Sequence, residues 1–206
     1  MGLKGGLNLT MLNQSSNFPS ALAIGTSTAK GTGFHVGLFV STSRQAEASF
    51  RIEMIYSARK TSVDYDKTTG SQGYTTRDQG TDALELDYIE LPLMVSLQPG
   101  RRISIHLGAG PVLALGADET IEGTVTNTSP GSTSTNHYRA VSSSTTGLAS
   151  VSLDGVIGVA YDLPIGLHFG VRYIMDVTDI HTSNFITAHE GVLQLSVGYC
   201  FMGKPE

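Results

Sequence analysis

Ionisable side chains stand at alternate positions in several segments, a spacing that turns them to one face of a β-strand. Arg51 and Glu53 are an example, because apolar residues flank each of them. Charges enclosed together must be paired, since an uncompensated buried charge is strongly destabilising. We therefore predict one internal network of ion pairs. Its members are Lys4, Arg51, Glu53, Glu90, Asp154, Arg172 and Asp176.

Three histidines, His35, His106 and His168, occupy the same inward positions and raise the question of a metal site. They fall on predicted strands that are not neighbours, so nothing enforces their convergence. We interpret them as hydrogen-bonded filler and predict no metal and no cofactor. Cys200 is the single cysteine, which excludes an internal disulfide, and its inward position predicts a small buried residue.

The elements that position these residues are segments in which apolar and polar or small residues alternate. Several exceed the five or six residues of an ordinary strand and reach the nine to eleven or so that a tilted membrane strand needs. Eight such segments are present: Gly2–Thr10, Gly33–Ser43, Ala48–Arg59, Leu84–Leu97, Ile103–Ala117, Ala149–Tyr161, Gly166–Val177 and Ile186–Phe201.

The connections alternate in length. Short polar links (44–47, 98–102 and 162–165) follow the second, fourth and sixth segments. Longer links follow the others, including Gly70–Asp82 and the Ser/Thr-rich stretch Thr124–Thr146, which we interpret as mobile polar loops. This layout predicts one domain over residues 1–206: an eight-stranded antiparallel up-and-down transmembrane β-barrel, with four long loops on one rim and three short turns on the other.

The opposite face of these segments is uncharged, as a lipid-facing wall must be. Its residues include Phe34, Val36, Leu38 and Val40 in the second segment, Ile103, Ile105, Leu107 and Ala109 in the fifth, and Leu193, Leu195, Val197, Tyr199 and Phe201 in the last. The same alternation fits a soluble sandwich or lipocalin-like ligand-binding barrel. The long strands, the loop asymmetry and tyrosines towards strand ends favour the membrane barrel.

Composition excludes other classes. Charged residues make up 15% of the chain and the net charge is −5, with no basic stripe, so nucleic acid is not an expected partner. No apolar stretch approaches the roughly 20 residues of a membrane helix. The N-terminus lacks a signal peptide's apolar region, and we interpret it as a mature form.

Several short stretches resemble the outer-membrane β-barrel family that includes the PorT-type proteins. They are Gly2 to Asn8, Gly33 to Gly37, Glu53 to Ser57, Tyr88 to Leu93, Gly108 to Pro111, Arg172-Tyr173 and Leu195 to Phe201. The resemblance implies a bacterial outer-membrane location and insertion by the barrel-assembly machinery, with Phe201 as the C-terminal aromatic signal. The usual signal is terminal, whereas Met202–Glu206 follow here. Some relatives serve protein secretion.

One stretch, Asp179 to Asn184, places His181 two residues before Ser183. This His-x-Ser element resembles that of outer-membrane lipid A deacylases, where a histidine activates a serine nucleophile. The resemblance implies His181 as base, Ser183 as nucleophile and Glu190 as orienting acid. The element falls in a predicted loop, away from the lipid-facing wall, and short motifs match by chance, so a polar loop is preferred.

We therefore expect a porin-like but filled, non-enzymatic barrel surrounded by outer-membrane lipid. It would have a structural, adhesion or secretion-accessory role, exerted through its loops or its periplasmic rim on an extracellular or periplasmic protein partner. Candidate contact residues in the loops are Tyr74, His137 and Tyr138. A lipid A deacylase-like hydrolase and a soluble ligand-binding barrel remain the alternatives.

Overall fold

The computed structural model describes residues 1–16, 27–42, 47–71, 73–100, 102–143, 151–178 and 186–201, and every regular element among them is a strand. The ten strands are β1 (Gly2–Ser16), β2 (Ser27–Ser41), β3 (Ala48–Ser71), β4 (Tyr74–Glu90), β5 (Leu93–Leu97), β6 (Ile103–Ser129), β7 (Ser132–Ser143), β8 (Val151–Asp162), β9 (Leu167–Asp176) and β10 (Ile186–Cys200).

The strands close into a barrel whose wall has eight strands, as predicted. All pairings are antiparallel, and β1 completes the ring by pairing with both β2 and β10. Strands β4 and β5 form one wall strand, interrupted because Pro92 has no N–H to donate. Hydrogen bonds from Leu91 N to Pro111 O and from Glu53 N to Pro92 O continue the ladder across the break.

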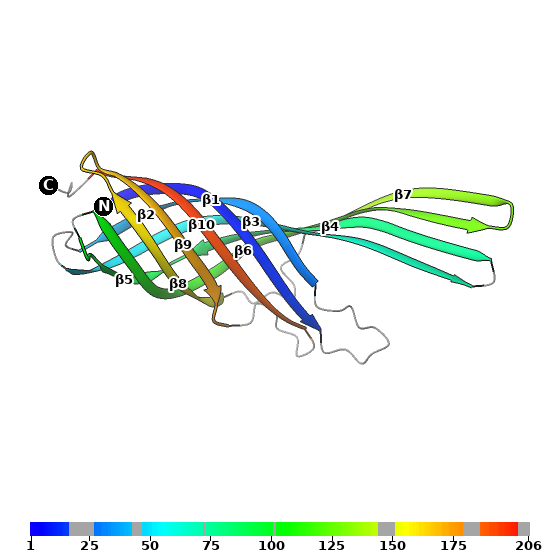
Figure 1. The fold of residues 1–206 in the computed structure, drawn as a ribbon, viewed down its shortest axis with the longest axis horizontal. Helices are drawn as coiled ribbons and strands as arrows, with labels where there is room; N and C mark the ends of the chain where they lie inside the picture. The colour runs from blue at the N-terminus through cyan, green and yellow to red at the C-terminus, as the bar shows by residue number, and fades with distance from the viewer. Residues whose placement is uncertain are drawn as a thin grey trace.

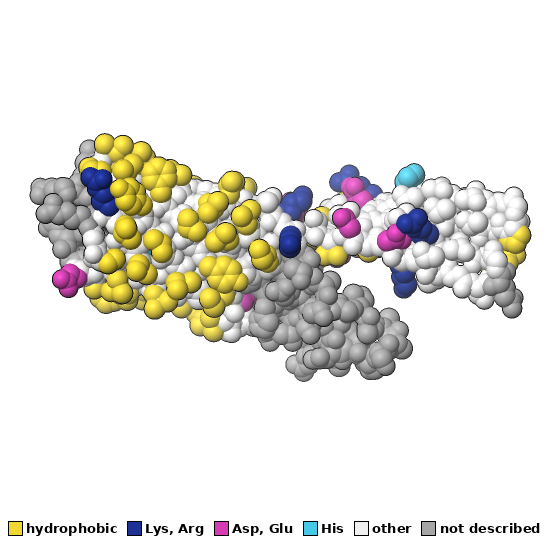
Figure 2. All heavy atoms as spheres, in the orientation of Figure 1, with side chains coloured by type: hydrophobic (Ala, Val, Ile, Leu, Met, Phe, Trp, Pro, Cys, Tyr) yellow, Lys and Arg dark blue, Asp and Glu magenta, His cyan; other side chains and the backbone are white. Residues whose placement is uncertain are grey.

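The faces of the wall follow the predicted alternation. Inward residues such as Lys4, His35 and Gln194 are buried, and the outward residues of the described strands are mostly exposed. Figure 2 shows hydrophobic side chains spread over the visible face of the barrel. A wide exposed apolar surface is what a barrel presents to lipid. No helix among the described residues is long and apolar enough to cross a membrane.

Three wall strands, β3, β4 and β6, continue past the barrel and form with β7 a second, flat element, at the right of Figure 1. We call it the projecting sheet and define it as residues 60–71 of β3, 74–85 of β4, 118–129 of β6 and 132–143 of β7. Its strand order is β3-β4-β6-β7. A β-bulge at Asp87/Tyr88 marks the place where the barrel wall passes into this sheet, and such bulges add bend and twist.

The projecting sheet corrects the interpretation of 70–82 and 124–146 as mobile loops, because most of both stretches is strand. Each hairpin closes through two residues whose second is a glycine with positive φ, Gly73 at 84° and Gly131 at 88°. Both faces of these strands meet solvent, so their sequence lacks the apolar alternation by which strands are recognised.

The first residue of β1 pairs with the last residue of β10, so both ends of the barrel sequence lie at one rim (Figure 1). The last residues of β2, β5 and β8 lie at the same rim, and the projecting sheet leaves from the other. In outer-membrane barrels short turns are periplasmic and long connections extracellular. The projecting sheet therefore continues the rim of the long connections.

Candidate functional site

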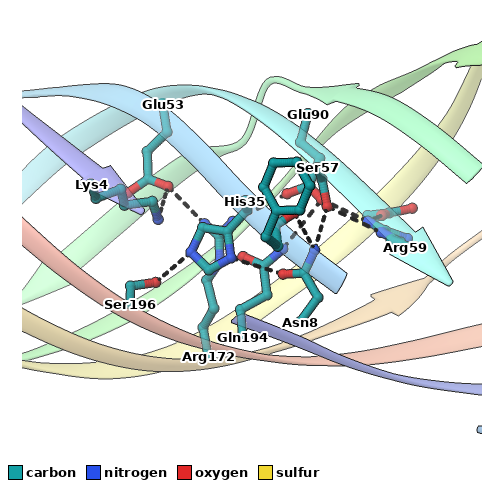
Figure 3. A network of polar contacts seen from close by, with 12 residues as sticks. Lys4, Asn8, His35, Glu53, Ser57, Arg59, Glu90, Arg172, Gln194 and Ser196 are labelled. Atoms are coloured by element: carbon teal, nitrogen blue, oxygen red, sulfur yellow. Dashed lines mark hydrogen bonds and ion pairs between the residues drawn. The ribbon is translucent and has the colours of Figure 1, made fainter. Parts of the chain in front are cut away.

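A buried carboxylate, Glu53, is the centre of the lumen network (Figure 3). Its side chain is 2% exposed and meets three cations. Lys4 Nζ lies 2.5 Å from Oε2, Arg51 Nε 2.6 Å from Oε1, and Arg172 Nη1 2.7 Å from Oε2. Arg51 also lies over the ring of Phe39, 3.9 Å from its centroid. Three converging cations compensate one carboxylate, which is the condition for burying such charges.

Glu90 forms the second half of the network. Arg59 Nη2 lies 2.7 Å from Glu90 Oε1, and Arg172 Nη2 lies 3.1 Å from Oε2, so Arg172 joins the two carboxylates. Arg172 Nε also donates to Gln194 Oε1 over 2.6 Å. Asp154 enters from β8, with Oδ2 3.6 Å from Arg59. The network therefore connects the wall strands β1, β3, β4, β8, β9 and β10 across the lumen.

Neutral polar groups fill the space beside these charges. Asn8 donates to Ser57 Oγ over 3.0 Å, and its Oδ1 lies 2.8 Å from His35 Nδ1. The other ring nitrogen of His35 lies 2.9 Å from Ser196 Oγ. A small cavity of about 20 Å³ lies between Lys4, Glu53, Arg172 and their neighbours. It is about large enough for one water molecule, so the interior there is packed.

Nearer the short-turn rim, two histidines come together although their strands are not neighbours in the wall. The rings of His106 and His168 are 6.4 Å apart at their centroids. His106 is hydrogen-bonded to Ser96 and Ser104, and His168 Nδ1 lies 2.8 Å from Asp162. A narrow barrel brings opposite walls into contact, which the argument from strand order overlooked. Among the described residues no group of three or more His, Cys, Asp or Glu could hold a metal ion.

Six of the seven predicted network residues belong to the ion pairs described above. The seventh, Asp176, is half-buried and lies opposite Asp154 in the β8–β9 register. Sequence reasoning omitted Arg59, which has inward parity but stands at the end of its predicted segment. Cys200 is buried, and Phe201 follows β10 with an exposed ring. His181 and Ser183 lie outside the described residues, as does the side chain of Glu190.

The outward face of the projecting sheet carries a ladder of cross-strand ion pairs. Lys60 pairs with Glu85 at its base, and Arg77 binds both carboxylate oxygens of Asp66 at 3.0 and 2.5 Å. Hydrogen bonding to Arg77 lowers the pKa of Asp66. One strand pair further on, Arg139 Nε lies 2.8 Å from a carboxylate oxygen of Glu122. Such pairs contribute little each, but they fix the register of a sheet that has no core.

The other face of the projecting sheet is held by two tyrosines. Tyr65 on β3 and Tyr138 on β7 reach over the two middle strands, and their hydroxyl groups are hydrogen-bonded. Tyr138 also donates to Asp78 Oδ1 over 2.8 Å, and the bonds to Tyr65 and Asp78 raise the pKa of Tyr138. A Cβ on Gly80 or Gly123 would come within 2.5 Å of a tyrosine hydroxyl, so both positions need glycine. Hydrogen bonds of these tyrosines therefore connect the projecting sheet from its β3 edge to its β7 edge.

A closed wall with an exposed apolar belt and an ion-paired interior defines an outer-membrane β-barrel. The chain belongs to the family of the outer membrane protein beta-barrel domain, whose family model matches residues 1–182. It is a protein of the bacterial outer membrane. This match is to the general domain family and does not single out the PorT-type proteins.

Solved structures of outer-membrane proteins are similar to this chain at low identity. Neisserial surface protein A is 14% identical, with a TM-score of 0.43 and 97% of each chain covered. Ail, the attachment invasion locus protein of Yersinia pestis, is 10% identical, with a TM-score of 0.40 and 96% of this chain and 97% of Ail covered. The outer membrane enzyme PagL is 12% identical, with a TM-score of 0.28 and coverages of 94% and 99%. At these values the similarity says nothing about activity. No curated protein matches the sequence.

Proposed function

We propose that this protein is a non-enzymatic adhesion protein, in which the barrel is a rigid anchor and the projecting sheet is the contact surface. The projecting sheet is the observation that carries the proposal. Its four strands extend beyond the apolar belt of the barrel, and its faces are organised by ion pairs and by the Tyr65–Tyr138 contact. An ordered extracellular element of this size presents backbone and side chains to another surface without first having to fold.

The filled lumen supports the same proposal, because it argues against transport as the main task. Glu53, Glu90 and Arg172 meet across the interior, and an eight-stranded barrel is only wide enough for such side chains. The network fixes the wall strands relative to one another, which suits an anchor. In this proposal the barrel is surrounded by lipid and was inserted by the barrel-assembly machinery, with Phe201 as the recognised aromatic residue.

The test shortens the projecting sheet without touching the barrel. Residues 64–81 and 122–139 are each replaced by Asn-Gly, which leaves the pairs Val63↔Asp82 and Ile121↔Ala140 at the new hairpin ends. Each new end pair lies an even number of residues from the native closing pair of its hairpin, so it is a hydrogen-bonded pair like the native one. A two-residue turn can therefore close it. A heat-modifiable gel shift reports whether the trimmed barrel is folded.

A laboratory host bacterium without adhesins of its own then produces either protein. Retention is counted on cultured epithelial cells, on a collagen-coated plate and on a layer of bacteria producing the same protein. We expect the wild type to raise retention on at least one of the three and the trimmed protein on none. Equal retention by the folded trimmed variant, or no effect of the wild type on any surface, would overturn the proposal.

The absence of catalysis is part of the proposal and has its own test. The alternative hydrolase would use His181 and Ser183, so Ser183→Ala must change the acyl content of lipid A if the enzyme exists. We expect the lipid A of cells producing wild type, Ser183→Ala or no protein to be identical by mass spectrometry. The role in secretion that the PorT-type resemblance implies would instead appear as a loss of exported proteins on deletion of this protein, unaffected by trimming the sheet.

A further inference from the structure

Strand β7 is one free edge of the projecting sheet. Over its 12 residues it pairs with β6, and no other described strand pairs with it. The hairpin closes at Ser129↔Ser132 around a two-residue turn, and such a closing pair is hydrogen-bonded. Hydrogen-bonded and non-hydrogen-bonded pairs alternate along an antiparallel ladder. From Thr133 to Ser143, every second residue therefore turns its N–H and C=O away from β6.

The edge formed by β7 lacks the usual protections against pairing. Natural edge strands carry lysine, proline, bulges or unpaired charges. Strand β7 has no lysine and no proline, and its register with β6 is continuous. Its two basic residues are engaged within the sheet, Arg139 with Glu122 and His137 with Thr124. Nothing on β7 therefore repels a further strand.

The opposite edge of the projecting sheet is different. Beyond Ser62, where its pairing with β2 ends, β3 carries Asp64, Asp66 and Lys67 on the free stretch. Asp64 and Asp66 are bound within the sheet by Thr81 and Arg77, but Lys67 is the residue type that natural edge strands use against pairing. Pairing of β3 with β7 of a neighbour, which would build open filaments, is therefore disfavoured. The sheet is left with one edge able to accept a strand.

We propose that this edge pairs with β7 of a second copy of the same chain and thereby joins two cells. The inference rests on the proposed adhesion function and names its partner. A contact with two-fold symmetry uses the same surface of both copies, so it stops at a dimer. Two identical strands related by a two-fold axis can pair only in the antiparallel direction. The charge of Arg139 in each copy is compensated by Glu122 of its own sheet, so the joined ladder brings no uncompensated like charges together.

The direction of β7 decides where the two barrels lie. It begins at the far tip of the projecting sheet, after Gly131, and returns to the barrel, as Figure 1 shows. In an antiparallel pair the second copy begins where the first ends, so its barrel lies at the opposite end of the joined sheet. Two barrels placed in this way stand in two membranes that face each other. Many copies on each cell make individually weak contacts effective together.

The experiment blocks the edge with one residue. Thr135→Pro removes an N–H that points away from β6, and proline is tolerated at such edge positions. Its matched control is Thr68→Pro on β3, the opposite edge of the sheet. Thr68 also stands at a non-hydrogen-bonded position of its hairpin, so proline there removes the equivalent outward N–H from the guarded edge. Val141→Lys is a second variant: Val141 is 61% exposed, and lysine there supplies the missing edge charge without altering the backbone.

Two differently coloured populations of the host bacterium are mixed, and mixed aggregates are counted by flow cytometry. We expect aggregates only when both populations produce wild-type protein or Thr68→Pro. Thr135→Pro and Val141→Lys should reduce the count to that of non-producing cells, with the heat-modifiable gel shift unchanged.

Aggregation of producers with non-producers, or undiminished aggregation of folded Thr135→Pro and Val141→Lys cells, would overturn the pairing. Wild-type cells that never aggregate would also overturn it. Retention on epithelial cells or collagen that depends on the sheet would then still uphold the proposed function, so the two failures are distinguishable.

Discussion

Removing the charge of Glu53 should destabilise the barrel far more than removing the charge of an exposed glutamate. Glu53→Gln keeps the shape of the side chain but leaves Lys4, Arg51 and Arg172 converging on a neutral amide. Breaking a buried pair by removing one partner costs about 3–5 kcal/mol. Glu122→Gln is the matched control, because the Glu122 side chain is 58% exposed and forms an ion pair with the exposed Arg139. Such surface pairs contribute about 0–1 kcal/mol.

Urea unfolding of the protein in lipid vesicles, followed by the heat-modifiable gel shift, measures both effects. With a denaturant slope of about 2 kcal/mol per molar, Glu53→Gln should lower the midpoint by about 2 M. Glu122→Gln should lower it by less than about 0.5 M, from the same slope. Equal midpoints for the two variants would show that the lumen charges are solvated and would refute the argument from burial.

Three further predictions follow from the same structure. Hydrogen bonds to Tyr65 and Asp78 raise the pKa of Tyr138. The neutral side chain therefore stabilises the projecting sheet fully below the ordinary tyrosine pKa, and this stabilisation is lost as the pH rises through the raised pKa. The ionisation of Tyr138 is measured as the difference between the ultraviolet titration curves of the wild type and Tyr138→Phe. This difference curve should show no step near pH 10 and a single step at higher pH; a step centred near pH 10 contradicts the prediction. Phe201→Ala should lower the amount of folded barrel in the outer membrane several-fold, measured by gel shift of membrane fractions, and unchanged assembly would remove its assigned role. In planar bilayers the wild type should show no steady conductance, whereas regular open channels would contradict a filled lumen.

The barrel was predictable because its strands separate two unlike environments. Phe169 outside and His168 inside differ in polarity because one meets lipid and the other the lumen, and that contrast appears in the sequence as a period of two. Inward parity likewise identified Lys4, Glu53 and Arg172. It did not identify their partners, because pairing depends on how far each side chain reaches across the lumen.

The projecting sheet was not predictable in the same way. Thr124 and His137 lie on one exposed face and Val125 and Asn136 on the other, and water reaches both. Without an apolar side the alternation disappears, and the residues resemble a polar loop. The available signal was the Pro130-Gly131 pair, a turn dipeptide flanked by threonines and serines.

Brominated lipid tests most directly whether the apolar positions face the membrane and the polar ones the lumen. The chain contains no tryptophan, so a single one can be introduced as a reporter. Phe169→Trp places it at an outward position that is 43% exposed, and Phe39→Trp at an inward position that is 1% exposed. Bromine on the acyl chains should quench fluorescence strongly in the first variant and hardly in the second. Equal quenching, or stronger quenching at position 39, would contradict the assignment of the two faces.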